Sequence, residues 1–444
     1  LAVLTVVCGH LFPTKIPSGY LGVDIFFVLS GFLITSLLLN EHAVHSKIYL
    51  LRFYGRRFLR LLPALSLLLV LYSIVTVLNG QAFSSISSGI WASFFYYLNW
   101  QYVFSFPRSY GDLGYLWSLS IEEQFYIALP FVLGVLALIG RRFDAAQRIR
   151  IWTVGFIVLG LASAVVMVGS SKQKYGWFDP QFRPGFLFYS PFTRAWEFFL
   201  GLLVAIAVLR YEQGRKYLGS AMRTVLSIIA VLVIVYVLVT RVDGNGSQIT
   251  ACALTALATG LLIFSLSGSK LDAQKFFGVG VFQAIGNSSY SIYLWHWIGV
   301  SVSLDLMRPD SSIDKSILVT ASMLPAVISY RYIEQPFRKL RNGSTQIKVL
   351  SGLGLVLVPT LMLFGLDFTK TQARESYGNV YASAVLSGCD FMNDVCVVGE
   401  DTAAKKVLLY GDSHIYQLIP IFVDYTKTHD VQITTCALVC NGEQ

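Results

Sequence analysis

The sequence predicts a polytopic α-helical membrane bundle followed by the start of an α/β domain. Hydrophobic residues make up 55% of the 444 positions and charged residues only 13%, whereas soluble domains carry roughly a quarter charged residues. Apolar runs long enough to cross about 30 Å of hydrocarbon recur along the chain. After the last of them, a short apolar run leads into a Gly-Asp-Ser-His turn. This order of segments is typical of an α/β domain attached to a membrane bundle.

Eleven apolar segments are the expected membrane spans. They cover residues 1–12, 20–39, 61–78, 116–139, 151–168, 191–209, 225–240, 249–266, 279–303, 317–333 and 349–364. A further run, 90–104, is aromatic and polar enough to lie along the interface or to re-enter instead of crossing. The chain begins inside an apolar run at Leu1 and stops at Gln444. We therefore expect it to be truncated at both ends.

The distribution of positive charge predicts the orientation of these spans. With the N-terminus in the cytoplasm, the inner loops hold roughly twice as many Lys and Arg residues as the outer loops, as the positive-inside rule requires. The net charge of +9 is explained in this way without a nucleic acid partner. Eleven spans then place the tail outside. The four tail cysteines agree with this, because clustered cysteines indicate disulfides in an oxidising compartment; they are Cys389, Cys396, Cys436 and Cys440, and their connectivity stays open.

The chain divides into three predicted parts. Residues 1–366 form the membrane domain, 367–388 a polar linker, and 389–444 the incomplete N-terminal part of the α/β domain. In this last part, 407–410 is predicted to be a buried strand, 415–425 a helix and 431–435 a second strand. We expect a multi-pass protein of the bacterial inner membrane whose C-terminal domain is periplasmic or extracellular.

Ionisable residues inside the spans are the first candidates for function, because such groups are costly in a bilayer. These candidates are His10, Asp24, Glu122, Glu123, Arg194, Glu197, His296 and Glu334. The alternative is that they pair with one another to hold the bundle together, and Arg194 with Glu197, three positions apart on one helix face, is the pair that best fits it. Adjacent Glu122 and Glu123 cannot both face a shared cavity. His10 has the strongest claim to chemistry, since a neutral imidazole can take up a proton.

Two further motifs carry possible chemistry. Arg57 and Arg60 share a helix face at the inner end of a span, where two guanidinium groups suit a phosphate-bearing ligand; ordinary positive-inside anchoring is the alternative. Ser413 follows a predicted strand and opens a predicted helix, so that its own backbone N–H could stabilise an oxyanion. A serine that only caps the helix is the alternative there.

These motifs together resemble the membrane acyltransferase-3 family, in the branch with a C-terminal SGNH-hydrolase-like domain, such as bacterial O-antigen O-acetyltransferases. The matching stretches are His10 with "GYLGVDIFFVLSGFLIT", Arg57 and Arg60 with Pro63, "LWSLSIEEQFY", "TRAWEFFLG", "GNSSYSIYLWHW", "YIEQPFR" and "GDSH". The resemblance implies that His10 is the membrane catalytic histidine, that Arg57 and Arg60 form the RxxR motif tied to acyl-CoA use, and that Ser413 is the outer nucleophile.

The sequence departs from the family pattern at three places. Tyr115 and Ile298 stand where many relatives have His and Pro, and the arginine-bearing segment that precedes the first span in the family is absent. The remaining SGNH blocks would lie beyond Gln444, and Asp412 belongs to the turn rather than to a catalytic triad.

The resemblance implies an O-acetyltransferase that moves an acyl group, most simply acetyl, across the membrane. The donor would be cytoplasmic acyl-CoA, and the acceptor a hydroxyl of a surface glycan such as lipopolysaccharide O-antigen. His10, Glu122 and Ser413 are the expected catalytic residues, and neither a metal nor a permanently bound cofactor is expected. Peptidoglycan or another exopolysaccharide is the alternative acceptor. A secondary transporter would not explain the GDSH turn, and a membrane-tethered esterase would not need a buried histidine or glutamate.

Overall fold

The computed structural model describes two separate units, Leu1–Thr360 and Leu361–Gln444. Within them it describes residues 1–45, 49–78, 83–105, 111–171, 183–213, 219–242, 245–267, 280–307, 323–339, 389–390, 395–398, 402–411, 425–426 and 428–437. The predicted linker 367–388, the predicted span 349–364 and Ser413 lie outside these residues.

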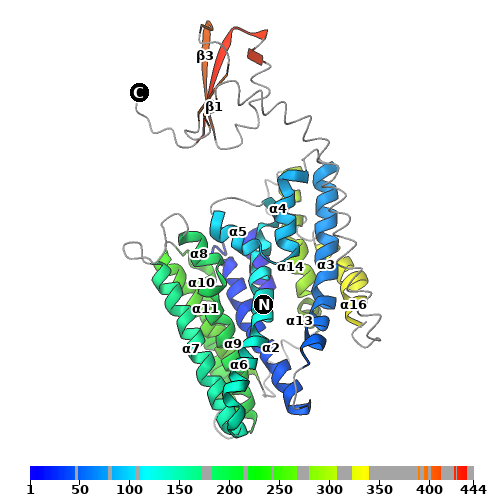
Figure 1. Ribbon diagram of the computed structural model, residues 1–444, viewed down its shortest axis with the longest axis vertical. Helices are drawn as coiled ribbons and strands as arrows, with labels where there is room; N and C mark the ends of the chain where they lie inside the picture. The colour runs from blue at the N-terminus through cyan, green and yellow to red at the C-terminus, as the bar shows by residue number, and fades with distance from the viewer. Residues whose placement is uncertain are drawn as a thin grey trace. The chain divides into compact units, whose positions relative to one another are not determined.

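The first unit is a bundle of helices, most of which run roughly alongside one another (Figure 1). Its elements are α1 (Ala2–Leu11), η1 (Gly19–Leu21), α2 (Gly22–His45), α3 (Leu50–Leu78), α4 (Phe83–Phe94), α5 (Leu98–Ser105), η2 (Gly111–Leu116), α6 (Trp117–Ile139), η3 (Gly140–Arg142), α7 (Ala145–Ser171), α8 (Arg183–Tyr189), α9 (Pro191–Gln213), α10 (Ser220–Val239), α11 (Asn245–Leu266), α13 (Gly280–Asn287), α14 (Ser289–Met307), the π-helix η4 (Tyr330–Glu334) and α16 (Gln335–Lys339).

Seven helices in the described part of the chain are long and apolar enough to cross a membrane: α2, α3, α6, α7, α9, α10 and α11. Their outward faces carry large apolar side chains; Val154, Val158 and Leu161 of α7 are examples of exposed ones. A stripe of this kind is typical of a surface in contact with lipid rather than water. The chain is a multi-pass membrane protein.

Other predicted spans look different in the structure. The first is the short helix α1 of 10 residues. The predicted span 279–303 is divided by a turn at Ser288 into α13 and α14. The segment 90–104 is not one helix, since α4 ends at Phe94 and α5 begins at Leu98. Between them Tyr96 has a positive φ of 55°, which ends a right-handed helix.

Among the described helices, α2 and α9 pack most closely against each other. A Cβ at Gly31 of α2 would lie 2.1 Å from the carbonyl oxygen of Phe198, and one at Gly201 of α9 would lie 2.0 Å from that of Val28. Only glycine permits this approach of two backbones. The ring of Phe198 stacks on Phe27 across the same interface, with centroids 4.5 Å apart.

At the beginning of the chain, helix α1 is likewise held in place by a close backbone approach at glycine residues. A Cβ at Gly9 would come within 2.6 Å of the Cα of Gly19, and one at Gly19 within 2.3 Å of the Cα of Gly9. The last turn of α1 therefore lies directly against η1. His10, the next residue after Gly9, is fixed by this contact rather than left at a loose helix end.

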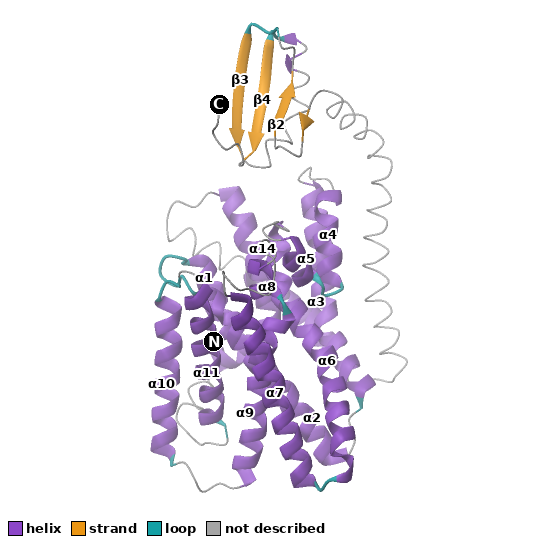
Figure 2. Ribbon diagram, turned by 60° about the vertical axis from the view of Figure 1, so that its left-hand side comes forward, coloured by secondary structure: helices purple, strands orange, loops and turns teal. Residues whose placement is uncertain are grey.

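The second unit contains a four-stranded sheet in the order β1-β2-β4-β3, and Figure 2 shows β2, β4 and β3 side by side. The strands are β1 (Cys389–Asp390), β2 (Val395–Val398), β3 (Lys405–Gly411) and β4 (Val431–Ala437). Strands β3 and β4 are parallel, with Val407 opposite Ile433, so a crossover must join them. Both segments predicted as strands in the tail are strands. The expectation that 407–410 is buried is wrong for Val407 and Leu408, which are 40% and 68% exposed. Most of the helix expected between them, 415–425, lies outside the described residues.

Candidate active site

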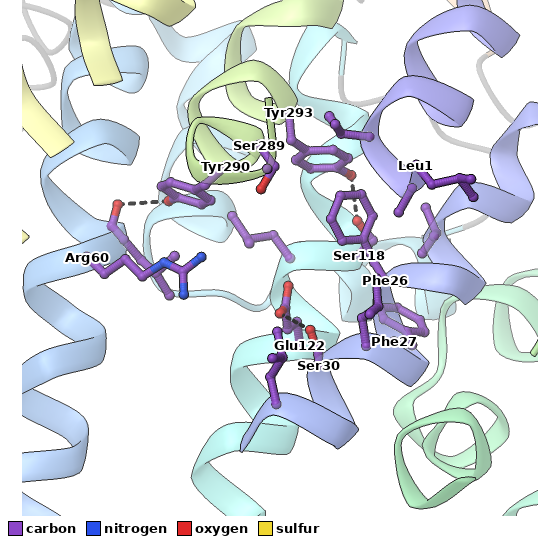
Figure 3. A pocket seen from close by; sticks show the side chains of 18 of the residues that line it. Leu1, Phe26, Phe27, Ser30, Arg60, Ser118, Glu122, Ser289, Tyr290 and Tyr293 are labelled. Carbon is purple, nitrogen blue, oxygen red and sulfur yellow. Dashed lines mark hydrogen bonds between the residues drawn. The ribbon is translucent and has the colours of Figure 1, made fainter. Parts of the chain in front are cut away.

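A cavity of about 490 Å³ lies in the membrane unit between α1, α2, α3, α6, α13 and α14. Apolar side chains such as Phe26 and Phe27 form part of its wall. Polar groups converge on it: Arg60 enters from α3, and Glu122 from α6 (Figure 3). An apolar cavity with a few convergent polar groups is the usual form of a small-molecule site.

Glu122 is fixed in the cavity wall by two hydroxyl groups. Ser30 of α2 and Tyr126, one helical turn further along α6, both donate hydrogen bonds to its Oε1. Glu123 is buried but is not among the residues that line the cavity. Of the two adjacent carboxylates, only Glu122 faces this space, as the helical geometry requires.

Arg57 and Arg60 both line the cavity from α3. The guanidinium carbon of Arg57 lies 4.0 Å from the centre of the Tyr126 ring, a cation–π contact that holds the group against the tyrosine. The hydroxyl of the same tyrosine binds Glu122. Tyr126 thus places the arginine and the carboxylate beside the same space.

A second cavity, of about 830 Å³, shares Arg57 and Arg60 with the first. We call it the arginine vestibule, because six cationic side chains line it: Arg52, Arg56, Arg57, Arg60, Arg338 and Lys339. Glu41 is the acidic residue among its described lining residues, and it pairs with Arg56 at 3.2 Å. The excess of positive charge favours an anionic ligand.

His10 of α1 and His296 of α14 contact each other. Nδ1 of His10 lies 3.2 Å from Nε2 of His296, and the two ring planes are nearly parallel, at 3°. His296 is fully buried, whereas His10 is only partly so. The edge of Trp297 packs against His10, with ring centroids 4.5 Å apart. Two of the predicted site residues, 286 positions apart in sequence, therefore form one unit.

Tyr293 joins this histidine pair to the cavity. It lines the cavity, and its ring centroid lies 5.4 Å from that of His296. Its hydroxyl donates to the backbone carbonyl of Tyr115 at 2.7 Å and lies 2.5 Å from Oγ of Ser118. The histidines themselves are not among the residues that line the cavity, so Tyr293 is a residue that borders both the cavity and the pair.

Asp24, Arg194 and Glu197 form a different cluster, between α2 and α9. Nη2 of Arg194 lies 3.0 Å from Asp24, and its Nε lies 3.0 Å from Glu197. All three side chains are at most 1% exposed, and none of them lines either of the two cavities. A buried, paired cluster of this kind fixes how two helices pack, as expected of the structural alternative for these charges.

Glu334 also contributes to helix packing rather than to the cavities. It lies in the π-helix η4 and is fully buried. It accepts a hydrogen bond from Ser291 of α14 at 2.8 Å and pairs with Arg338 at 3.3 Å. The contact ties η4 to the helix that carries His296.

The sequence did not reveal several residues of this site. Ser30 and Ser118 are small polar residues in apolar spans, and Tyr293 is one of many aromatic residues. The remaining basic residues of the vestibule look in the sequence like ordinary positive charges of cytoplasmic loops. Tyr126 could have been found, because it lies four residues after Glu122 on the same helix face.

Comparison with known proteins identifies the class. A family model described as an acyltransferase domain matches residues 1–331, most of the membrane unit. The fold and the match together define an integral-membrane acyltransferase domain. The chain belongs to the acyltransferase-3 family.

Two relatives illustrate the similarity. The chain is 32% identical over 358 residues to the peptidoglycan O-acetyltransferase OatA of Listeria monocytogenes, which covers 77% of this chain and 55% of the relative. It is 31% identical over 391 residues to the O-acetyltransferase OatA of Staphylococcus aureus, which covers 83% of this chain and 62% of the relative. The chain thus matches somewhat more than half of the length of these relatives. No solved structure matches it.

Proposed function

We propose that this protein transfers an acetyl group from acetyl-CoA to a hydroxyl of a cell-envelope glycan, across the bacterial inner membrane. One observation carries the proposal: two cavities of opposite character share Arg57 and Arg60. One is rich in cations, and the other is largely apolar and is bordered by Tyr293, next to the histidine pair.

Acetyl-CoA has the shape and charge distribution that this arrangement suits. Its nucleotide end carries several phosphate charges, which the guanidinium groups of the arginine vestibule would bind through paired hydrogen bonds. Its long, less polar arm would extend past Arg57 and Arg60 into the apolar cavity. The thioester at its tip would then approach Tyr293 and the histidine pair. No permanently bound cofactor or metal is part of this proposal.

The proposed acceptor is inferred from the expected location of the tail and from the relatives. Positive-inside counting over the eleven expected spans would place the tail outside the cytoplasm, where glycan hydroxyls are present and CoA thioesters are not. A relative named for peptidoglycan favours peptidoglycan over lipopolysaccharide O-antigen, the acceptor that the resemblance alone first suggested. In this scheme Ser413 receives the acetyl group, or guides it, on the outer side.

In the chemical step, His10 acts as the base and Glu122 acts through charge. His10 would take the proton from the attacking hydroxyl, so that the oxygen can form a bond to the thioester carbonyl carbon. Glu122, held by Ser30 and Tyr126, would balance the charge of the nearby arginine pair while leaving the arginines free to bind the donor.

Acetyl transfer itself tests the proposal. Full-length protein in inverted membrane vesicles is supplied with acetyl-CoA labelled in the acetyl group, and both CoA release and labelled glycan are measured. We expect both signals, and we expect His10→Ala to abolish both. Label that crosses the membrane without CoA release would indicate a transporter, and ester hydrolysis without transfer would indicate an esterase.

A second variant separates a relay from a single membrane site. In full-length protein, Ser413→Ala should stop glycan labelling but still permit CoA release, because the donor is used before the outer serine acts. Glycan labelling at the wild-type rate in Ser413→Ala would mean that this serine is a helix cap or an accessory group.

A further inference from the structure

His296 lies beside the proposed base without lining the donor cavity, which raises the question of what it does there. Its Nδ1 lies 2.6 Å from the backbone carbonyl oxygen of Tyr293, in the preceding turn of α14. A carbonyl oxygen can only accept a hydrogen bond, so Nδ1 of His296 must carry the proton. In a neutral imidazole the other nitrogen, Nε2, then has a free lone pair and can only accept.

That lone pair fixes the state of His10. Nδ1 of His10 lies 3.2 Å from Nε2 of His296, and because Nε2 accepts, Nδ1 of His10 must donate. The proton of His10 is thus held on Nδ1, and its Nε2 keeps the lone pair. Repulsion between two lone pairs would oppose the other tautomer of His10, in which Nδ1 carries no proton.

We propose that His296 is a positioning residue that holds His10 in the Nδ1–H tautomer, so that Nε2 of His10 is the atom that takes the proton in acyl transfer. This inference rests on the proposed function of His10 and deepens it. The chain of donors runs from His10 through His296 to the carbonyl of Tyr293, and the ring of Trp297 packs against His10.

The arrangement serves both halves of the reaction. Nε2 of His10 accepts the proton of the hydroxyl that first receives the acetyl group, before Ser413 acts, while that oxygen forms a bond to the thioester carbonyl carbon. The C–S bond then breaks, and the departing sulfur takes the proton back from Nε2. The products are the ester and the free thiol of CoA. Throughout, Nδ1–H of His10 continues to donate to His296, so neither ring has to turn.

The structure around the pair keeps the carbonyl of Tyr293 in position. The hydroxyl of Tyr115 donates to the carbonyl of Leu294, the residue after Tyr293, and the hydroxyl of Tyr293 donates to the carbonyl of Tyr115. These two reciprocal bonds tie this turn of α14 to η2. Orientation of a base by a second group, and of that group by a third, is the general logic of catalytic triads.

The direct test is ¹⁵N NMR of the full chain in lipid bilayers, with labelled histidine. We expect Nδ1 of His10 to be protonated and Nε2 unprotonated, with the His10 signals assigned by their loss in His10→Gln. In His296→Leu, which has no acceptor, His10 should change to the Nε2–H form. His10 in the Nε2–H form in the wild-type protein would overturn the inference whatever the activity of any variant.

Turnover of acetyl-CoA gives the second readout. His296→Leu should lower kcat by roughly 10²-fold, with the KM for acetyl-CoA changed by no more than about twofold, because the vestibule is untouched. His296→Gln should recover most of kcat, since its amide oxygen can accept from His10. Equal loss in both variants at the wild-type melting temperature would refute a positioning role.

Failure of the inference and failure of the proposed function give different results. If His10→Ala still releases CoA at the wild-type rate, His10 is not the base and the proposed function is wrong. If His10→Ala is inactive but His296→Leu keeps the wild-type kcat, the base is correct and the positioning role is wrong. If His296→Leu does not fold, the tautomer in the wild-type protein and the recovery in His296→Gln still decide the question.

Discussion

The membrane unit contains two charged clusters that differ in access and in balance. Arg194 is enclosed by two carboxylates and is fully buried. Arg57 and Arg60 instead line two cavities, in a vestibule where cations outnumber acids. The sequence pointed to the first cluster through charge inside apolar spans, and to Arg57 and Arg60 through their shared helix face at the inner end of a span. The difference shows that a closed, balanced cluster holds helices together, whereas an open, unbalanced one is available to a ligand.

Loss of the closed cluster should have the largest effect. Arg194→Leu leaves Asp24 and Glu197 buried without a counter-charge, which costs about 3–5 kcal/mol. We expect little or no folded protein, measured by size-exclusion chromatography and thermal unfolding in detergent. Arg150→Ala, at an exposed arginine of α7, is the matched control and should melt like the wild type. A normal melting temperature for Arg194→Leu would remove the distinction between the clusters.

The open cluster should respond in activity and not in folding. Arg57→Ala should lower kcat/KM for acetyl-CoA by roughly 10- to 100-fold, the loss expected for hydrogen bonds to a charged group. Arg57→Lys should recover little, because the planar fork and its contact with Tyr126 are lost. Both variants should melt like the wild type, and near-normal kcat/KM for Arg57→Ala would show that this pair only anchors the helix.

Substitution of Glu122 tests whether turnover at the open cluster depends on this carboxylate. Glu122→Gln keeps an oxygen that can accept from Ser30 and Tyr126, so folding should be preserved. The lost negative charge should lower kcat by roughly tenfold. The measurement is steady-state CoA release alongside a melting curve. Wild-type kcat would make Glu122 a packing residue like Glu334.

The smallest expected effect lies at the rim of the vestibule. Arg52 is exposed, so Arg52→Gln should raise the KM for acetyl-CoA only by about two- to threefold, as surface charges contribute less than about 1 kcal/mol. High salt should abolish the difference. Acetyl-pantetheine, a thioester donor without nucleotide phosphates, should not respond to the change. An equal response to both donors would place the nucleotide elsewhere.

Composition and local pattern were sufficient for the class of fold and for much of the helix map. Long apolar runs become α2, α3 and α6, and the two tail strands are confirmed as β3 and β4. The break at Ser288 between α13 and α14 was missed, because an apolar run shows hydrophobicity but not the turn within it. The π-helix at Tyr330–Glu334 was missed for the same reason.

The site was predicted as single residues and not as contacts. Asp24 and Arg194 were both candidates, but their pairing across α2 and α9 has no local signal. The contact of His10 with His296 depends on how α1 packs against α14, and no sequence spacing encodes it. Only neighbours on one helix, such as Arg194 with Glu197, or Glu122 with Tyr126, follow from spacing alone.

The close approach of α2 and α9 has an evolutionary consequence. At Gly31 and Gly201 any side chain would meet a backbone carbonyl at about 2 Å, so selection should remove nearly every substitution there, as it does at a catalytic position. Gly31 directly follows Ser30, a partner of Glu122. Packing at Gly31 and chemistry at Ser30 should therefore both make neighbouring positions of α2 invariant. Only variants assayed for both folding and turnover can show which of the two causes applies at each position.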